Sequence, residues 1–179
     1  MNKTRQITGF SMLFIVLIIL DQIFKHMVVT GIEFGSRIVV IENFFSLQYV
    51  RNTGSAFSFL ADQSWGIYVL SGISIVLGTA IFAIMVMSCG KGFKYMTCAL
   101  CLLSAGAYGN LIDRVRLHYV VDFLRFDFGP YTFPIFNFAD ICAVVGTFMI
   151  IGAGLFASKY FDRFLESFKA GEAHDEPEV

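Results

Sequence analysis

Long hydrophobic stretches without a single charge dominate this chain. Three of them cover residues 63–90, 95–112 and 141–158, and a helix needs about 20 apolar residues to cross a bilayer. A fourth stretch runs from Gly9 to Leu20 and continues into a polar end that begins with Asp21. The pattern predicts four membrane-spanning helices, at about 8–28, 66–88, 95–113 and 139–158.

The two long segments between these spans follow a different pattern. Residues 36–60 contain runs of β-branched and aromatic residues that end in a turn at Asn52–Gly54, and this predicts strands. Residues 114–136 are also rich in aromatic and β-branched residues. We therefore expect a small β-sheet and an amphipathic segment at one membrane surface. Residues 1–170 would form a single membrane domain, and the acidic residues 171–179 a disordered tail.

Composition supports a membrane protein. Of the 179 residues, 56% are hydrophobic and only 15% are charged, and a soluble domain of this size could not bury so much apolar surface. The net charge is −1, without the basic stripe that a nucleic-acid partner would need.

The positive charges predict the orientation. Lys3 and Arg5 precede the first span, Lys91 and Lys94 link the second to the third, and further basic residues follow the fourth. Because cytoplasmic segments are enriched in Lys and Arg, both termini are expected in the cytoplasm. The first span lacks a small-x-small cleavage site and continues into Asp21, so it is expected to be a retained anchor.

Polar residues within and beside the spans gather at the ends of the spans that lie away from the cytoplasm. Because successive spans alternate in direction, the topology brings all of them to one face of the membrane. An ionised aspartate at the bilayer centre costs about 2.5–3.5 kcal/mol, so such residues are expected to be paired or functional. The set comprises Asp21, Lys25, Asn52, Gly54, Asn110, Asp113, Arg114, Asp122, Asn137 and Asp140.

Structural explanations exist for several of these residues. Asp21 and Lys25 have the spacing of a helical ion pair, Arg114 is expected to be a counter-charge for a carboxylate, and Asp140 could cap a helix. Asp122 stands in an apolar run that gives an unpaired carboxylate no structural purpose. The pair Asp122 and Asp140 is therefore the best candidate for catalysis.

Other chemistries are less well supported. The histidines lie far apart without an H-E-x-x-H motif, and there is no G-x-S-x-G motif. Cys98 and Cys101 form a C-x-x-C pair, but no third ligand is near, so they are expected to be buried thiols. A serine paired with Lys25 stays open as an alternative. We predict no metal and no cofactor.

Five short motifs resemble, in order, those of the lipoprotein signal peptidase (signal peptidase II) family. The motifs are Asp21-Gln22-x-x-Lys25, Asn52 to Ser58, Gly109 to Arg114, Val120 to Phe123, and Phe136-Asn137-x-Ala139-Asp140. The resemblance implies that Asp122 and Asp140 are a catalytic dyad. It also implies a site shaped by Asp21, Lys25, Asn52, Gly54, Asn110, Asp113, Arg114, Asn137 and Ala139. One departure is Tyr108, where the family commonly has an aliphatic residue.

The same resemblance implies an activity and a location. The substrate would be a diacylglyceryl-modified prolipoprotein, cut on the amino side of its lipidated cysteine by an aspartic endopeptidase. The enzyme would be a monomer in the bacterial inner membrane, with four helices, a small periplasmic sheet and its site near the periplasmic face.

Two other classes of function fit part of the pattern. Intramembrane acids also occur in transporters and proton-linked channels, although here the second and third spans are apolar between their ends. A purely structural membrane subunit would explain the composition but not the gathered acids. Solute or ion flux across vesicles would distinguish a transporter from a protease.

Overall fold

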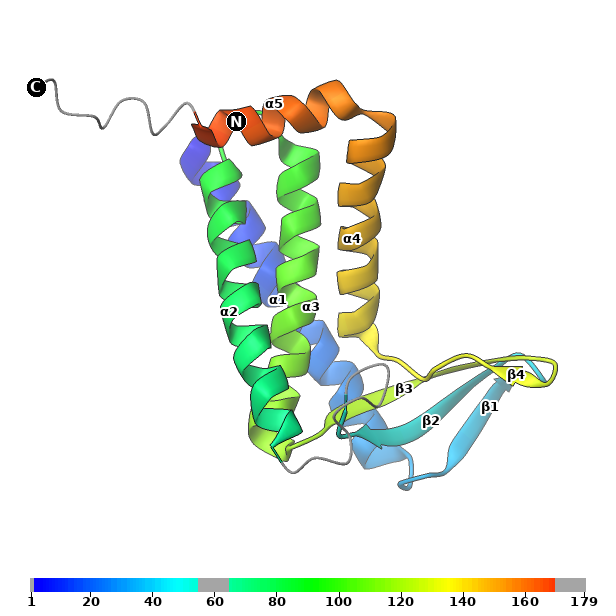
Figure 1. Ribbon diagram of the computed structural model, residues 1–179. Helices are drawn as coiled ribbons and strands as arrows, with labels where there is room; N and C mark the ends of the chain where they lie inside the picture. Colours follow the sequence, from blue (N-terminus) through cyan, green and yellow to red (C-terminus); the bar gives the residue numbers. More distant parts are fainter. Residues whose placement is uncertain (1, 55–64, 170–179) are drawn as a thin grey trace, which may run out of the picture.

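The computed structural model describes residues 2–54 and 65–169. Four long helices run side by side through it (Figure 1), and each is long and apolar enough to cross a membrane. The prediction of four spanning helices is therefore confirmed. The helices are α1 (Lys3–Gly31), α2 (Gly66–Ser88), α3 (Lys94–Leu117) and α4 (Phe138–Phe156).

Helix α3 is the centre of the bundle and packs against the other three spans. Its contact with α4 depends on small residues. A Cβ atom on Gly106 would collide with the carbonyl oxygen of Ala139, and one on Gly146 would lie 2.7 Å from the carbonyl oxygen of Ala99. Within a membrane, helices gain stability from such close backbone approach, because lipid supplies no hydrophobic driving force between them.

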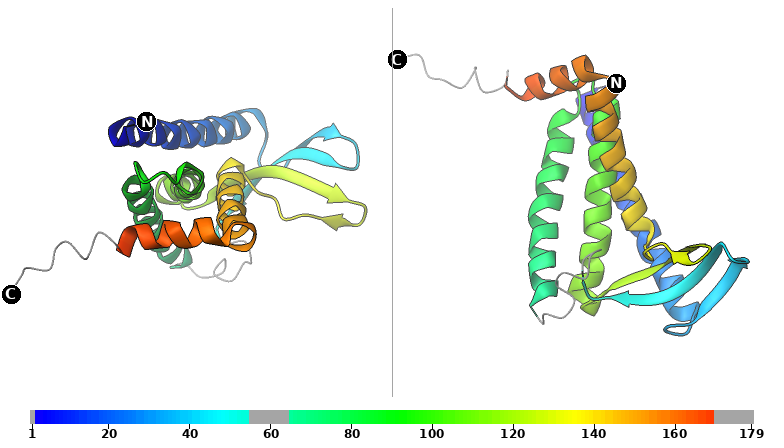
Figure 2. Two further views of the ribbon diagram at one scale, coloured as in Figure 1. Left: turned by 90° about the horizontal axis from the view of Figure 1, so that it is seen from above. Right: turned by 45° about the vertical axis from the view of Figure 1, so that its right-hand side comes forward.

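The sheet projects sideways from one end of the bundle (Figure 2). Its four antiparallel strands lie in the order β1-β2-β3-β4. The central pair joins a segment that precedes α2 to one that follows α3, so the sheet ties distant parts of the chain together. The strands are β1 (Arg37–Ile41), β2 (Phe45–Asn52), β3 (Val120–Phe128) and β4 (Tyr131–Thr132).

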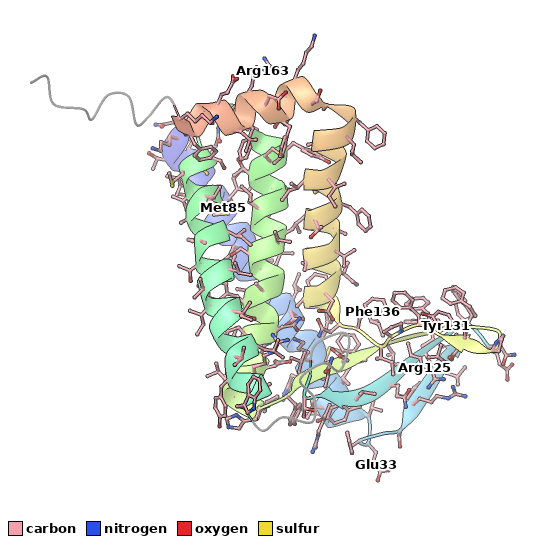
Figure 3. All side chains as sticks on the ribbon, in the orientation of Figure 1. Glu33, Met85, Arg125, Tyr131, Phe136 and Arg163 are labelled. Atoms are coloured by element: carbon pink, nitrogen blue, oxygen red, sulfur yellow. The ribbon has the colours of Figure 1, made fainter. Side chains whose placement is uncertain are left out.

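The two faces of this sheet differ in chemistry. On one face Phe126 stacks on Phe45 at 4.8 Å and on Phe136 at 5.9 Å between ring centroids. On the other face Arg125 binds Asp127 through bonds of 2.9–3.0 Å. Figure 3 places Phe136 on the side of the sheet nearer the helices and Arg125 on the opposite side. Residues 114–136 were expected to form an amphipathic segment, and they contribute β3 and β4 to a sheet with one aromatic and one charged face.

A fifth helix, α5 (Ser158–Lys169), was not predicted. It lies across the other end of the bundle (Figure 1), where Phe164 is buried in a core cluster with Met85 and Met96. The Nζ atom of Lys91 donates a 2.6 Å hydrogen bond to the carbonyl oxygen of Ser167 on α5. Its spacing of apolar residues at 160, 161, 164, 165 and 168 would have indicated an amphipathic helix. The predicted tail, 171–179, lies outside the described residues.

Candidate functional site

At the sheet end of the bundle, the first of two carboxylate clusters surrounds a lysine. The Nζ atom of Lys25 lies 2.9 Å from Asp21 Oδ2 and 3.0 Å from Asp113 Oδ2. All three residues are at least 97% buried. The predicted ion pair between Asp21 and Lys25 is present, and Asp113, one helix away, completes it. We call these three residues the ion-pair cluster.

The ion-pair cluster joins four elements of the fold. Asp21 Oδ1 on α1 accepts a 2.9 Å bond from the backbone N–H of Ala139, in the first turn of α4. Asp113 Oδ2 on α3 accepts a 3.0 Å bond from the backbone N–H of Val121, on β3. Both carboxylates therefore act as fixed acceptors for backbone that carries the rest of the site.

Two neighbours of this cluster were part of the recognised motifs but not of the predicted site. Gln22 donates to Asp113 Oδ1 at 3.1 Å and to Asp21 Oδ2 at 3.2 Å. Gly109 has no room for a side chain, since a Cβ atom there would lie 2.8 Å from Asp21 Oδ2 and 2.9 Å from Ala139 Cβ. Ala139 faces Gly109 at this close approach, so a larger side chain at position 139 would also lack room.

The second cluster contains Asp122 on β3 and Asp140 on α4, and we call it the amide-held pair. Asp122 accepts from Asn137 Nδ2 at 2.6 Å and from Asn52 Nδ2 at 2.9 Å. Asp140 accepts from Asn110 Nδ2 at 2.7 Å and from the backbone N–H of Asn137 at 3.0 Å. In the described part of the chain, no Lys or Arg nitrogen lies within 4.0 Å of either carboxylate.

Asp140 also has the capping role that its position suggested. Asn137 is the N-cap of α4, and its Oδ1 accepts a 3.0 Å bond from the backbone N–H of Asp140, while Asp140 returns the bond to Asn137. This capping box explains how the helix begins. It also fixes the carboxylate next to Asp122, so the structural and the chemical explanations apply together.

Asn52 and Gly54 close the site from the sheet. Asn52 ends β2, and its Oδ1 accepts a 3.0 Å bond from the backbone N–H of Gly54, which leaves its Nδ2 directed at Asp122. The turn expected at this point therefore orients the amide. Residues 55–58 of the same motif lie outside the described residues.

Burial raises the pKa of Asp122 from its ordinary value of 3.8 to about 7, and the negative charge of Asp140 adds to the effect. Hydrogen bonds from Asn52 and Asn137 work in the opposite direction. Two carboxylates that repel each other in a dry site hold a proton more tightly than either would alone.

The predicted role of Arg114 as a counter-charge is exerted at a distance, because its positive charge interacts favourably with the carboxylates of Asp140 and Asp122. In the described residues no carboxylate lies within 4.0 Å of its guanidinium. Its Nη1 reaches Ser74 Oγ at 3.4 Å, and its buried Nε has no hydrogen-bond partner among residues 2–54 and 65–169. Consecutive residues on a helix point in different directions, so Asp113 joins the ion-pair cluster while Arg114 turns toward the cavity.

A cavity of about 780 Å³ opens over the amide-held pair. Asp122, Asp140 and Arg114 line it together with apolar residues that include Phe136 and Val144. A smaller cavity of about 430 Å³, over the face of the sheet that carries Arg125, contains none of the predicted site residues. Across the described ranges no group of three or more His, Cys, Asp or Glu is placed to hold a metal ion.

Known proteins resemble this chain over most of its length. The family model described as signal peptidase (SPase) II matches residues 13–156. A lipoprotein signal peptidase of Shouchella clausii is 42% identical over 142 residues, which cover 79% of this chain and 85% of the relative. One from Psychromonas ingrahamii is 34% identical over 145 residues, or 80% and 83% of the two chains.

A solved structure described as a bacterial membrane enzyme superposes with a TM-score of 0.74 at 31% identity. The match covers 84% of this chain and 90% of that one. A second such structure has a TM-score of 0.71 at 32% identity, covering 83% and 93%. With the family model matching well over half of its residues, this multi-pass membrane protein belongs to the signal peptidase II family.

Proposed function

We propose that this protein is an aspartic endopeptidase that removes the signal peptide from lipid-modified prolipoproteins. It cuts on the amino side of the lipidated cysteine. Relatives that are 34% and 42% identical to it over about four fifths of its length are lipoprotein signal peptidases. The observation that carries the catalytic type is the amide-held pair, because Asp122 and Asp140 line one cavity from two different elements.

In the proposed mechanism the two aspartates share one proton. The ionised member takes a proton from water, whose oxygen attacks the scissile carbonyl carbon, while the neutral member protonates the carbonyl oxygen. The tetrahedral intermediate then collapses: one of its hydroxyl groups returns a proton to the pair as the C=O bond forms again, the C–N bond breaks, and the leaving nitrogen takes a proton from the pair, which is left with its one shared proton. The titration belongs to the pair as a unit, and the raised pKa of Asp122 supports a shared proton near neutral pH.

Arg114 is suited to bind the substrate's carbonyl oxygens. Its buried Nε lacks a partner within the described part of the chain, and the residue lines the cavity beside both aspartates. The ammonium of Lys25, by contrast, already contacts Asp21, Asp113 and Asn110. A fixed donor directed at a developing negative charge is worth most in a site that excludes water.

The surroundings of the cavity fit a lipid-modified substrate. Val144 on α4 lines the cavity and is 51% exposed on the surface that would face lipid. Acyl chains attached to the substrate's cysteine could stay in the bilayer while its peptide reaches the aspartates. We place the site at the periplasmic face of the inner membrane, with both termini and the α2–α3 link in the cytoplasm, because that link carries Lys91 and Lys94.

The test is cleavage of a purified, lipidated precursor in vesicles by Asp122→Asn and Asp140→Asn variants. Each should lose turnover while it stays folded. Asp162→Asn, an exposed site on α5, is the matched control and should cleave at the wild-type rate. An unlipidated precursor should be a poor substrate, and a chelator should leave activity unchanged. Near wild-type turnover in either folded dyad variant would overturn the proposal.

A further inference from the structure

We propose that Lys25 is a positioning residue for the aspartate pair, acting through Asn110. Its ammonium fixes the orientation of the Asn110 amide, and the amide in turn holds the Asp140 carboxylate. This inference rests on the proposed function, because it assigns a role in the same reaction. If Lys25 has this role, the ion-pair cluster contributes to catalysis as well as to the stability of the fold.

The hydrogen bonds around Asn110 define one orientation of its side chain. Asn110 Oδ1 accepts from Lys25 Nζ at 3.0 Å and from Asn137 Nδ2 at 3.0 Å. Asn110 Nδ2 donates to Asp140 Oδ1 at 2.7 Å. The two ends of an asparagine amide have nearly the same shape, so its orientation depends on its partners.

A flipped Asn110 would fail at every one of these contacts. Its NH₂ group would face the ammonium of Lys25 and the NH₂ group of Asn137, and its oxygen would face the carboxylate of Asp140. Of the two donors that prevent the flip, Lys25 carries a full charge, and hydrogen bonds from charged donors are about twice as strong as neutral ones. Lys25 therefore contributes the larger share of the orientation.

Lys25 is itself immobilised. Its Nζ contacts Asp21, Asp113 and Asn110 at 2.9–3.0 Å, which uses its three N–H groups, and only 3% of the residue is exposed. The positive charge therefore reaches the aspartate pair through a polarised amide and not by direct contact. This arrangement orients the Asp140 carboxylate without bringing the ammonium of Lys25 into contact with it, where the ammonium would favour loss of the shared proton.

A double-mutant cycle on the full-length enzyme in vesicles tests the inference. Lys25→Met removes the charged donor and Asn110→Ala removes the amide. Each should lower kcat by about 10- to 100-fold, the size of one charge-assisted hydrogen bond, with a much smaller change in KM. If Lys25 acts through Asn110, the double variant should cleave no more slowly than Asn110→Ala, since coupled residues are not additive. The pH profiles of both single variants should move in the same direction.

Two controls separate positioning from folding. Gln22→Met disturbs the same aspartates of the ion-pair cluster, and among the described residues Gln22 has no hydrogen bond to Asn110, so the change should lower Tm without moving the pH profile. Lys25→Arg keeps a charged donor and should recover part of kcat. If Lys25→Met does not fold, the cycle is run with Asp113→Asn added to every variant, which removes one of the two buried negative charges.

The outcomes distinguish the inference from the function on which it rests. If the losses in kcat multiply in the double variant, Lys25 acts independently of Asn110 and the inference is overturned. An identical pH profile in Lys25→Met and wild type would also overturn it. If cleavage survives in folded Asp122→Asn, the proposed function fails instead, whatever the Lys25 variants do.

Discussion

Two pairs of aspartates lie at the same end of this bundle, and they differ in what holds them. Asp21 and Asp113 share the ammonium of Lys25 at 2.9 and 3.0 Å. Asp122 and Asp140 are held by amide groups, from side chains and from one backbone N–H. The residue type is the same in both clusters, but Asp140 is only partly buried, whereas Asp21, Asp113 and Asp122 are buried.

This difference in partners indicates different roles for the two pairs of aspartates. A carboxylate beside a buried ammonium is committed to that partner, and removing either group leaves an uncompensated charge. A carboxylate held by neutral amides is kept in place while its proton stays exchangeable. The comparison therefore predicts that the carboxylates of Asp21 and Asp113 mainly determine whether the protein folds, and those of Asp122 and Asp140 determine whether it cleaves, with Lys25 linking the two through Asn110.

The largest expected effect is on cleavage by the amide-held pair. Asp122→Asn or Asp140→Asn should lower kcat by about 10²- to 10⁴-fold, the usual range for loss of a general acid or base. Stability should fall less than at the ion-pair cluster, because the replacement keeps the shape and one of the two acceptor oxygens. Single-turnover cleavage and thermal unfolding, measured on the same preparation, check both halves. A large loss of stability would remove the distinction between the clusters.

Next in size is a loss of stability at the ion-pair cluster. Asp21→Ala should lower the free energy of unfolding by about 3–5 kcal/mol, as expected when one partner of a buried pair is removed. It also deprives the Ala139 N–H of its acceptor. Arg37→Ala is the control, because its 3.7 Å pair with Asp127 is half-exposed and worth about 0–1 kcal/mol. Equal losses would show that burial of the pair is unimportant. Denaturant titration in detergent measures both.

A smaller loss of stability is expected at Gly109, where α3 lies close to Asp21 on α1 and to Ala139 on α4. Gly109→Ala forces a Cβ atom against Asp21 Oδ2 and Ala139 and should cost about 1–3 kcal/mol, as overpacking usually does. Gly152→Ala, also in a helix, meets nothing within 4 Å and should be neutral or slightly stabilising. Comparison of their Tm values tests whether the close approach matters.

The smallest expected effect is a shift in pH dependence. Because the pKa of Asp122 is raised to about 7, activity should fall about tenfold per pH unit above that value, as the pair loses its proton. For stability, the folded state holds this proton between pH 3.8 and about 7 while the unfolded chain does not, so stability falls as pH rises through that window. Asn52→Ala removes a bond that lowers this pKa, and it should move the alkaline limb of the pH–rate profile to higher pH. An unmoved limb would exclude Asp122 from that titration.

The sequence was sufficient to predict the spans and to predict which polar residues gather at one end of the bundle. Uncharged stretches predicted the four helices, and alternation of direction brought Asp21, Asp122 and Asp140 to one end, as the structure has them. Those features depend on local hydrophobicity and on topology, both of which can be read along the chain. The catalytic roles themselves stay predictions.

What the sequence could not supply depends on contacts between distant residues. The division of four aspartates into two clusters follows from which donors face them, and the bond from Asn110 to Asp140 joins different helices. Which carboxylates the charge of Arg114 faces, those of Asp140 and Asp122, likewise depends on how α3 packs against α4 and β3. For helix α5 the basic residues indicate only orientation, whereas the spacing of its apolar residues indicates an amphipathic helix.

Helix α5 has a practical consequence for protein production. The family match ends at residue 156, so a chain trimmed to the family's boundary would lose the whole of α5. Phe93, Met85 and Met96 would then lose Phe164 and Tyr160 as packing partners. Such a truncated protein should extract poorly from membranes and aggregate, even with every residue of the proposed active site in place.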